Sequence, residues 1–206
     1  MRTSAARTAD PTSNRRRSAT LRDLDDAALL ASIAAGNGDA MRSLFLRYRL
    51  HVYRFVLRLL NNAELADDLT SEVFLDVWRQ SRQFEGRSTV ATWIFAIARN
   101  KALATRRRQR HAPLDEAWLE TIEDTADDPE AAVQKIDRSR LLRQILAVLP
   151  VNHREIVDLV YYHEKSIPEV ATILGILPDT AKTRLFYARK HIAKRLTEAC
   201  HDRACM

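Results

Sequence analysis

Apolar residues recur along most of this chain at intervals of three and four positions, the spacing that places them on one face of a helix. The longest such stripe lies within 40–60, with arginines on the remaining surface, and consists of Met41, Leu44, Phe45, Tyr48, Val52, Phe55, Val56 and Leu59. The same spacing predicts helices over 25–35, 40–60, 63–80, 89–108, 139–148, 152–163, 166–174 and 178–197. We therefore expect an all-α protein made of two small helical domains.

Turn-forming and capping residues separate these predicted helices. The run Gly36-Asn37-Gly38 ends the first of them, and Pro150 separates two later ones. Asp39, Ser88 and Ser166 stand at expected helix starts, where a short polar side chain can cap free backbone N–H groups. Only 4 glycines and 6 prolines occur in 206 residues, which favours helices over a sheet, because hairpins need such residues at short intervals.

The charge pattern divides the chain into five parts. Residues 1–20 are basic and rich in Ser and Thr without an apolar period, which predicts a disordered tail. The first helical module covers 21–108 and the second covers 139–197. Between them, 109–138 contains nine acidic residues and two prolines, and we interpret it as an acidic flexible linker. The alternative, an exposed acidic loop of one domain, needs about twice the usual maximum length of a structureless loop. Residues 198–206 form a C-terminal tail.

The second module contains the outline of a helix-turn-helix. A short apolar helix is followed by a turn at Gly175 and by a basic helix that starts near Pro178. The apolar faces of the two helices carry Ile167, Val170, Ala171 and Leu174, and Leu185, Ala188, Ile192 and Leu196. Packing of these faces leaves outward the side chains that could contact base edges or phosphates, namely Lys182, Thr183, Arg184, Phe186, Tyr187, Arg189 and Lys190. An ordinary basic amphipathic helix is the alternative, but the three features together favour DNA binding.

A second basic element ends the first module. Its cations crowd the C-terminal half of the helix 89–108 and the residues just after it: Arg99, Lys101, Arg106, Arg107, Arg108 and Arg110. Trp93 and Phe95 precede them, so the element combines phosphate neutralisation with aromatic faces for base stacking, as a single-stranded nucleic-acid surface requires. The alternative is that these cations only stabilise the negative end of the helix dipole.

An acidic stripe marks the helix 63–80. Asp68, Glu72 and Asp76 recur at four-residue spacing, while Leu65, Leu69, Val73 and Val77 occupy the opposite, buried side. Carboxylates repel DNA, so this face should meet solvent or a basic protein partner.

The remaining composition restricts the class of protein. The formal net charge of +6 is compatible with a polyanionic partner. No run approaches the ~18 apolar residues of a membrane span, so we expect a cytoplasmic protein without membrane insertion. Cys200, His201 and Cys205 are a weak candidate for a metal site or redox-sensitive thiols. An incidental terminal cluster is the favoured interpretation, so neither a metal nor another cofactor is expected.

Three segments, taken in order, resemble the extracytoplasmic-function (ECF) class of bacterial RNA polymerase sigma factors. The first is 66–78, ADDLTSEVFLDVW. The second combines 84–88, FEGRS, with 91–100, ATWIFAIARN. The third combines Leu174-Gly175 with TAKTR at 180–184 and ARK at 188–190. The resemblance covers about 25–197, and three segments in this order are more specific than any one of them.

The resemblance implies a function for each part of the chain. It implies that Asp68, Glu72 and Asp76 bind the clamp helices of the polymerase β′ subunit. It implies that the loop and helix after them melt and read the −10 promoter element and capture a flipped base, through Phe84, Trp93, Arg99, Asn100, Lys101, Arg106, Arg107 and Arg108. The second module is implied to bind the −35 duplex and the β flap, and an anti-sigma protein is an expected partner.

Linker length is compatible with this interpretation. Promoter elements about 25 base pairs apart require modules roughly 85 Å apart, at ~3.4 Å per pair. A linker of about 30 residues reaches ~100 Å when extended. As a free coil it averages only ~30 Å, so a scaffold such as core polymerase must hold the modules apart. The chain also departs from the family pattern at Ser71, Pro178, Asp179 and Tyr187.

Two other functions are alternatives to that of a sigma factor. A stand-alone helix-turn-helix regulator of duplex DNA would use the first module for dimerisation or sensing. A helical enzyme is disfavoured, because the histidines are scattered and neither a paired-carboxylate site nor a Gly-rich phosphate loop is present. We therefore expect a sigma factor and not an enzyme.

Overall fold

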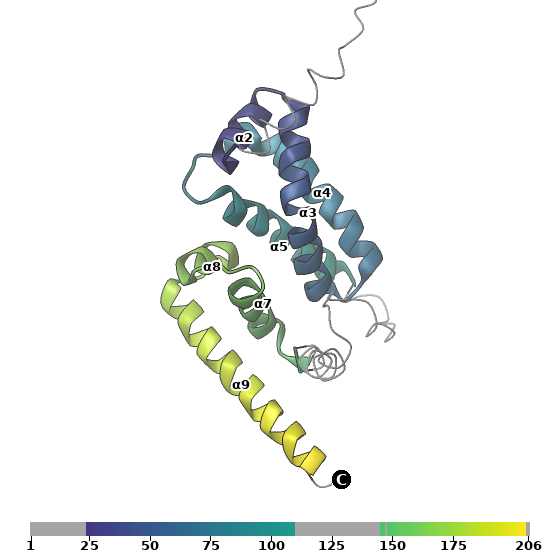
Figure 1. Ribbon diagram of the computed structural model, residues 1–206, viewed down its shortest axis with the longest axis vertical. Coiled ribbons are helices and arrows are strands. Elements are labelled where there is room, and N and C mark those ends of the chain that lie inside the picture. Colours follow the sequence, from purple (N-terminus) through teal and green to yellow (C-terminus); the bar gives the residue numbers. More distant parts are fainter. Residues whose placement is uncertain (1–23, 110–144, 147, 205–206) are drawn as a thin grey trace, which may run out of the picture.

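The computed structural model describes residues 24–109, 145–146 and 148–204, with side chains for all of these except 109 and 199–204. Its elements are α2 (Asp26–Ala34), α3 (Gly38–Leu60), α4 (Ala63–Gln80), the short 3₁₀ helix η1 (Ser81–Gln83), α5 (Val90–Gln109), α7 (Val151–Tyr161), α8 (Ile167–Leu174) and α9 (Pro178–Ala204). The described residues contain helices and no strand, which confirms the all-α prediction (Figure 1).

The first module is a bundle of α2 to α5. Helices α3 and α4 form a hairpin, and α5 packs against both. Aromatic rings from different helices meet inside the bundle: the ring centroids of Phe45 and Phe74 lie 4.9 Å apart, and those of Phe55 and Phe95 lie 5.3 Å apart. Their edge-to-face packing joins α3 to α4 and to α5.

The second module consists of α7, α8 and α9. Ile156 and Leu159 of α7, Val170 of α8 and Leu185 of α9 are buried together, and α9 packs on both shorter helices. Helix α9 lies on the side of α7 and α8 that faces away from the first bundle (Figure 1). The predicted helix 139–148 falls largely outside the described residues.

Two of the three predicted helix caps are wrong. Helix α3 begins one residue before Asp39, and Asn37 caps it by accepting hydrogen bonds from the backbone N–H groups of Asp39 and Ala40 at 3.0 and 3.1 Å. At the start of α5, Thr89 and not Ser88 accepts from the Thr92 N–H, at 3.1 Å. The errors arise because neighbouring polar residues can all cap, and only the local backbone path decides between them.

The cap at Ser166 is confirmed. It forms a capping box with Glu169: the backbone N–H and the hydroxyl of Ser166 both donate to Glu169 Oε2, at 3.0 and 2.7 Å. The prediction for the last helix was too short, since α9 continues from 197 to Ala204. Leu196 was expected in the core but is 37% exposed.

Gly175 is the turn residue of the helix-turn-helix. It ends α8 with φ +61°, in the left-handed region, and a Cβ built on it meets no neighbour. Gly175→Ala should therefore lower the free energy of unfolding by about 1–2 kcal/mol through backbone conformation alone. Urea unfolding measures this change. Gly38→Ala is the matched control, because its φ is not positive and alanine favours helix, so the free energy should stay level or rise.

Candidate nucleic-acid and polymerase interfaces

The outward face of α9 carries most of the residues predicted to read DNA. Side chains that are exposed are Lys182, Thr183, Phe186, Tyr187, Arg189 and Lys190, and Arg184 is half-buried. Phe186 is 63% exposed and its ring contacts that of Tyr187, with centroids 5.5 Å apart. Exposed aromatic rings of this size leave apolar area in contact with water, which is unfavourable. Such a patch beside cations is typical of a surface that binds another molecule. The outward face of α9 therefore combines exposed cations with exposed aromatic rings.

Two of these cations already have partners within the chain. Arg189 donates from Nε to the Tyr161 hydroxyl on α7 at 2.7 Å. Lys182 lies 3.1 Å from Asp179 in the first turn of α9. Both pairs are exposed, and exposed pairs contribute little stability, so breaking either pair should cost little free energy.

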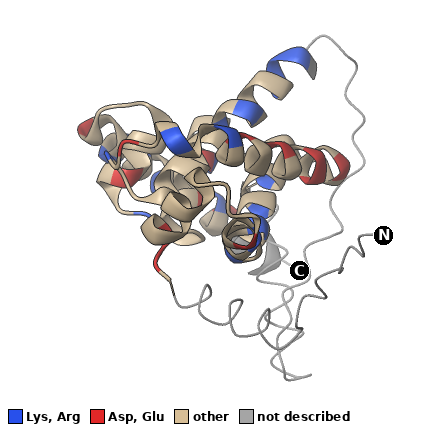
Figure 2. Cartoon of the chain, turned by 90° about the horizontal axis from the view of Figure 1, so that it is seen from above, with Lys and Arg blue, Asp and Glu red and all other residues tan. Residues whose placement is uncertain are grey.

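The predicted −10 surface lies on the loop before α5 and on α5 itself. Phe84 and Trp93 are half-buried with ring centroids 5.2 Å apart, and Asn100 is exposed. Near the end of α5, Arg107 and Arg108 are exposed and Arg106 is half-buried. In Figure 2, where all Lys and Arg are blue, basic residues colour the end of one helix at the edge of the molecule. This end of the surface is accessible to a DNA strand.

Lys101 forms ion pairs with two carboxylates of the acidic stripe. Its Nζ lies 2.9 Å from Asp76 Oδ2 and 3.1 Å from Glu72 Oε2. Partial burial by itself lowers the pKa of Lys101, but the hydrogen bonds to Asp76 and Glu72 outweigh burial and raise that pKa above its usual value. The structure thus joins a predicted DNA-binding residue to two residues of the predicted polymerase-binding stripe.

The acidic stripe itself is on the outer side of α4. Asp68 and Glu72 are exposed, Asp76 is half-buried, and Leu75 beside them is 53% exposed. The opposite side of α4 is buried, with Leu69, Val73 and Val77 in the core as predicted. The stripe is therefore a mixed acidic and apolar face.

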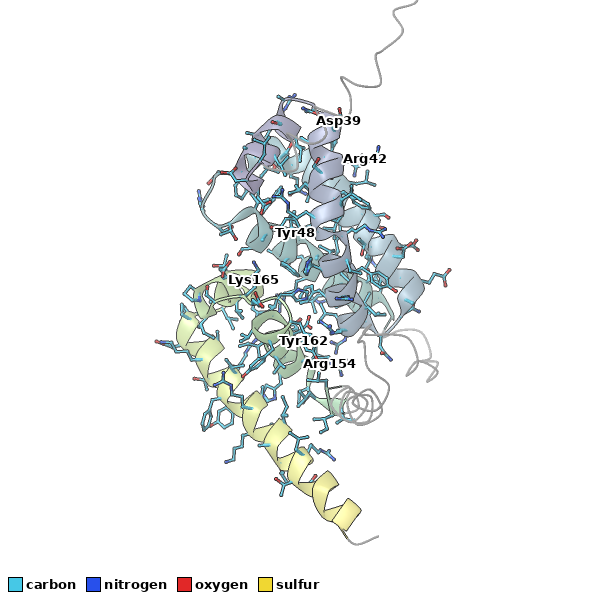
Figure 3. The ribbon with its side chains drawn as sticks, viewed as in Figure 1. Asp39, Arg42, Tyr48, Arg154, Tyr162 and Lys165 are labelled. Carbon is cyan, nitrogen blue, oxygen red and sulfur yellow. The ribbon has the colours of Figure 1, made fainter. Side chains whose placement is uncertain are left out.

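The two modules contact each other directly, which the sequence did not indicate. Helix α8 packs on α5 and helix α7 packs on α3. Figure 3 shows Arg154, Tyr162 and Lys165 along the contact between the two modules. We call the contact the module interface and define it by four polar residues of the second module, Glu155, Asp158, His163 and Glu169, and their partners on α3, α5 and Thr89.

Two ion pairs cross the module interface. Arg99 Nη2 lies 3.2 Å from Glu155 Oε2, with Glu155 only 1% exposed. Arg58 pairs with Asp158, and its guanidinium carbon lies 3.9 Å from the centroid of the Tyr162 ring. Arg99, a predicted −10 residue, is therefore held against the second module in this structure.

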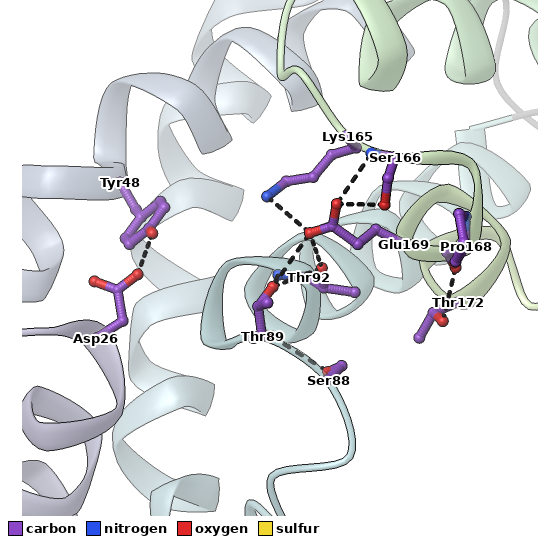
Figure 4. Close-up of polar contacts among 10 residues, drawn as sticks. All are labelled: Asp26, Tyr48, Ser88, Thr89, Thr92, Lys165, Ser166, Pro168, Glu169 and Thr172. Carbon is purple, nitrogen blue, oxygen red and sulfur yellow. Dashed lines mark hydrogen bonds and ion pairs between the residues drawn. The ribbon is translucent and has the colours of Figure 1, made fainter.

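A third polar contact lies at the N-terminal end of α5. Thr92 donates from its hydroxyl to Glu169 Oε1 at 3.0 Å, and the Thr89 hydroxyl lies 3.4 Å from the same oxygen (Figure 4). Partial burial alone raises the pKa of Glu169, but hydrogen bonds from Ser166 and Thr92 and the nearby Lys165 lower it to about 2. This carboxylate is therefore ionised at neutral pH.

His163 occupies the middle of the module interface. Its side chain is 2% exposed, and its ring lies 4.6 Å from that of Phe95, 5.8 Å from that of Phe55 and 5.9 Å from that of His51. Its Nε2 lies 3.3 Å from Asp158 Oδ2 without hydrogen-bond geometry. Sequence reasoning missed this residue, but Glu155 and Asp158 beside the apolar positions of the amphipathic helix 151–161 were a signal that a polar partner must cover them.

Acid should destabilise the chain. Burial lowers the pKa of both His51 and His153 below 6.5, and neighbouring side chains lower it further: His163, Arg54 and Lys165 for His51, and His191 and Arg184 for His153. The unfolded chain then binds protons more readily than the folded chain, so the free energy of unfolding should fall as the pH is lowered through 6.5. Urea unfolding at about pH 7.5 and about pH 5.5 measures the loss. In His51→Gln/His153→Gln the loss should be smaller; an equal loss would contradict the assignment.

The predicted metal or redox cluster lies outside the described side chains. Among the side chains that are described, no three His, Cys, Asp or Glu residues lie close enough to hold a metal ion. Within the same residues, no helix is both long and apolar enough to cross a membrane.

Comparisons with known proteins match both modules. Residues 44–112 match the family model of Sigma-70 region 2, and 139–192 match that of Sigma-70 region 4. The chain is 30% identical over 172 residues to the ECF RNA polymerase sigma factor SigL of Mycobacterium tuberculosis, covering 83% of this chain and 97% of SigL. It is 33% identical over 165 residues to the RNA polymerase sigma factor CarQ of Myxococcus xanthus, covering 79% and 92%.

Solved structures share the fold. CnrH in complex with the cytosolic domain of CnrY aligns with a TM-score of 0.63 at 22% identity, covering 84% of this chain and 97% of CnrH. The sigma factor RpoE in complex with the anti-sigma factor NepR from Bartonella quintana aligns with a TM-score of 0.63 at 21% identity, covering 76% and 96%. The relatives SigL and CarQ are both polymerase sigma factors, and nothing here favours a stand-alone regulator.

Proposed function

Because the chain belongs to the ECF class of RNA polymerase sigma factors, we propose that its two modules read two separate elements of one promoter. As a sigma factor it binds core RNA polymerase and directs promoter-specific initiation. In this proposal the first module, 21–108, reads the −10 element and the second, 139–197, reads the −35 duplex. The acidic linker 109–138 joins them, between the basic tail 1–20 and the C-terminal residues 198–206.

The observation that carries the proposal is the outward face of α9. Helix α9 packs through Leu185 and Ala188 onto α7 and α8, so its basic and aromatic side chains point away from the core. An α-helix fits the major groove, where Arg and Lys bond guanine and a Thr methyl or an aromatic ring contacts the thymine methyl. Lys182, Thr183 and Arg184 lie in the first two turns, the part of a recognition helix that reaches base edges.

The first module supplies a surface for the melted strand. Phe84 and Trp93 offer half-buried rings on which an unpaired base can stack, and exposed Asn100 can bond its edge. Arg107 and Arg108 neutralise phosphates at the end of α5. Lys101 can add to phosphate binding only when its pairs with Glu72 and Asp76 break.

The acidic and apolar face of α4 is proposed to bind the β′ clamp helices, and the second module to bind the β flap. Asp68 and Glu72 offer exposed carboxylates to a basic partner, and Leu75 adds apolar area that water would otherwise meet. Lys101 pairs with both Glu72 and Asp76, so these two carboxylates of the face are partly preorganised.

Asp68→Arg tests this face. Placing a cation against a basic partner should weaken binding to core RNA polymerase by about tenfold or more, because like charges across an interface repel. Titration of labelled protein with purified core polymerase measures the affinity. Asp67→Arg, at an exposed position one residue away on a different side of α4, is the matched control. Equal losses in both variants would remove the stripe as the contact.

The family also suggests a protein partner and a cellular location for this chain. RpoE and CnrH were each solved with a protein partner, an anti-sigma factor in the case of RpoE. We propose that an anti-sigma protein also holds this chain, and that the chain works in the cytoplasm with the polymerase. Its role is binding and not catalysis, because sigma factors position the polymerase, which performs the chemistry.

A further inference from the structure

Arg189, on the outward face of α9, is held by a side chain of another helix. Its Nε donates to the hydroxyl of Tyr161 at 2.7 Å, and its guanidinium carbon lies 5.7 Å from the centroid of the same ring. Lys182, by contrast, pairs with Asp179 of its own helix. One aromatic residue of α7 therefore sets the direction of a cation on the proposed recognition helix.

Stability does not explain this arrangement. Tyr161 is 53% exposed and Arg189 is exposed as well. A polar contact between exposed side chains adds little to the free energy of unfolding, and holding a long arginine side chain in one conformation costs rotamer entropy. What the contact does supply is a fixed orientation of the guanidinium group.

The core beneath the pair fixes the Tyr161 ring relative to α9. Tyr161 is the last residue of α7, and α7 packs on α9. Ile156 and Leu159 of α7 are buried in one cluster with Leu185 and Ala188 of α9. A close-packed core of this kind holds the two helices in one relative position. The hydroxyl that accepts from Arg189 therefore stands at a defined place beside α9.

The guanidinium group keeps most of its donors for another molecule. Arginine carries five N–H donors in a planar fork, and the Nε donor is the one that Tyr161 accepts. The N–H groups on the two terminal nitrogens of Arg189 have no acceptor among the described residues. Two parallel N–H groups at the end of a guanidinium match two oxygens of one phosphate.

The position of Arg189 along α9 suits the DNA backbone. Arg189 follows Lys182 by seven residues, so both lie on the same side of the helix, about 10 Å apart at ~1.5 Å per residue. The first turn of a recognition helix reaches base edges in a major groove about 12 Å wide. With Lys182 in the groove, Arg189 lies near the phosphates that border it.

We propose that Tyr161 is a positioning residue for duplex DNA, whose hydroxyl holds Arg189 so that its two terminal nitrogens bind a backbone phosphate beside the −35 element. The inference rests on the proposed function of the second module and adds to it a residue of α7, outside the recognition helix. Because the guanidinium is ordered before DNA arrives, less rotamer entropy is lost on binding. Phosphate contacts carry no base information, so the gain in affinity is the same for every sequence.

The test removes only the hydroxyl, with Tyr161→Phe in the full chain. The chain is bound to core polymerase, and anisotropy measures its affinity for a fluorescein-labelled promoter duplex taken from the start sites that the unchanged chain produces in vitro. Tyr161→Phe should weaken binding about two- to tenfold. Arg189→Ala should weaken it about tenfold or more. Adding Tyr161→Phe to Arg189→Ala should weaken it no further, because Tyr161 acts through Arg189.

Salt dependence separates positioning from charge. Arg189→Ala removes one phosphate contact, so the slope of log affinity against log salt concentration should fall by about 1. Tyr161→Phe keeps the charge of Arg189 and should leave that slope unchanged. A merely structural role of Tyr161 would instead lower the melting temperature, which should stay the same because the pair is exposed.

Tyr162→Phe is the matched control. It removes the neighbouring hydroxyl, on a ring that contacts Arg58 of the first module, and should leave the affinity for the duplex unchanged. Unchanged affinity in Tyr161→Phe would overturn the inference, and so would an equal further loss when Tyr161→Phe is added to Arg189→Ala. Transcription by the unchanged chain with core polymerase reports the proposed function separately from either result.

Discussion

Alanine at both Lys182 and Arg184 should lower transcription from the chain's own promoters by roughly 30-fold or more, because each specific base contact contributes about 1–3 kcal/mol and two contacts are removed. Lys182 is exposed and Arg184 half-buried on the first turns of α9, and neither lies in the buried core. Their loss should leave the fold and the binding of core polymerase intact. Run-off transcription and a thermal unfolding curve measure the two effects on the same preparation.

The control for this prediction lies on the same helix. Lys194→Ala/Arg195→Ala removes the same charge from exposed positions farther along α9, where each pairs only loosely with Glu198 at 3.9 Å. If the two double variants lose equal activity, α9 contributes only general electrostatic attraction. A loss confined to Lys182 and Arg184 assigns sequence reading to the start of the helix.

Phe55→Ala should lower the free energy of unfolding by about 3–5 kcal/mol, because it leaves a cavity in a packed core. Phe55 is fully buried and its ring contacts Phe95 inside the first module and His163 of the second. The free energy of unfolding of a small domain is only about 5–15 kcal/mol, so this substitution should remove a large part of it. Urea unfolding measures the change.

Leu46→Ala is the matched control for the core, because Leu46 stands on the same helix but is 54% exposed. Its effect should stay within about 0.5 kcal/mol. A similar loss in both variants would mean that burial in α3 does not determine stability.

Much of the fold could be predicted from apolar spacing. The described helices 63–80 and 167–174 agree with the prediction within one residue, because each has a clear apolar face and a clear stop. The cap of α3 could not be assigned, since Asn37 and Asp39 are both capping residues and the backbone path selects one. The end of α9 was placed too early because the apolar stripe of Leu185, Ala188, Ile192 and Leu196 ends at Leu196 and no large apolar residue follows in the helix.

The candidate sites were predicted unevenly for a physical reason. Outward residues of α9 could be deduced from one helix and its own period. The pairing of Lys101 with Asp76, and of Arg99 with Glu155, joins residues on different helices, and helix periodicity carries no information on such contacts. The sequence therefore identified the charged groups and left their partners unknown.

In vitro transcription tests directly whether the chain directs core polymerase to promoters with two separate elements. The purified chain is added to core RNA polymerase on fragments of genomic DNA, and the 5′ ends of the transcripts are sequenced. We predict new start sites that share two upstream elements about 25 base pairs apart, and their loss in Lys182→Ala/Arg184→Ala. The account would be contradicted if the chain bound duplex DNA tightly by itself and gave no initiation above that of core polymerase alone.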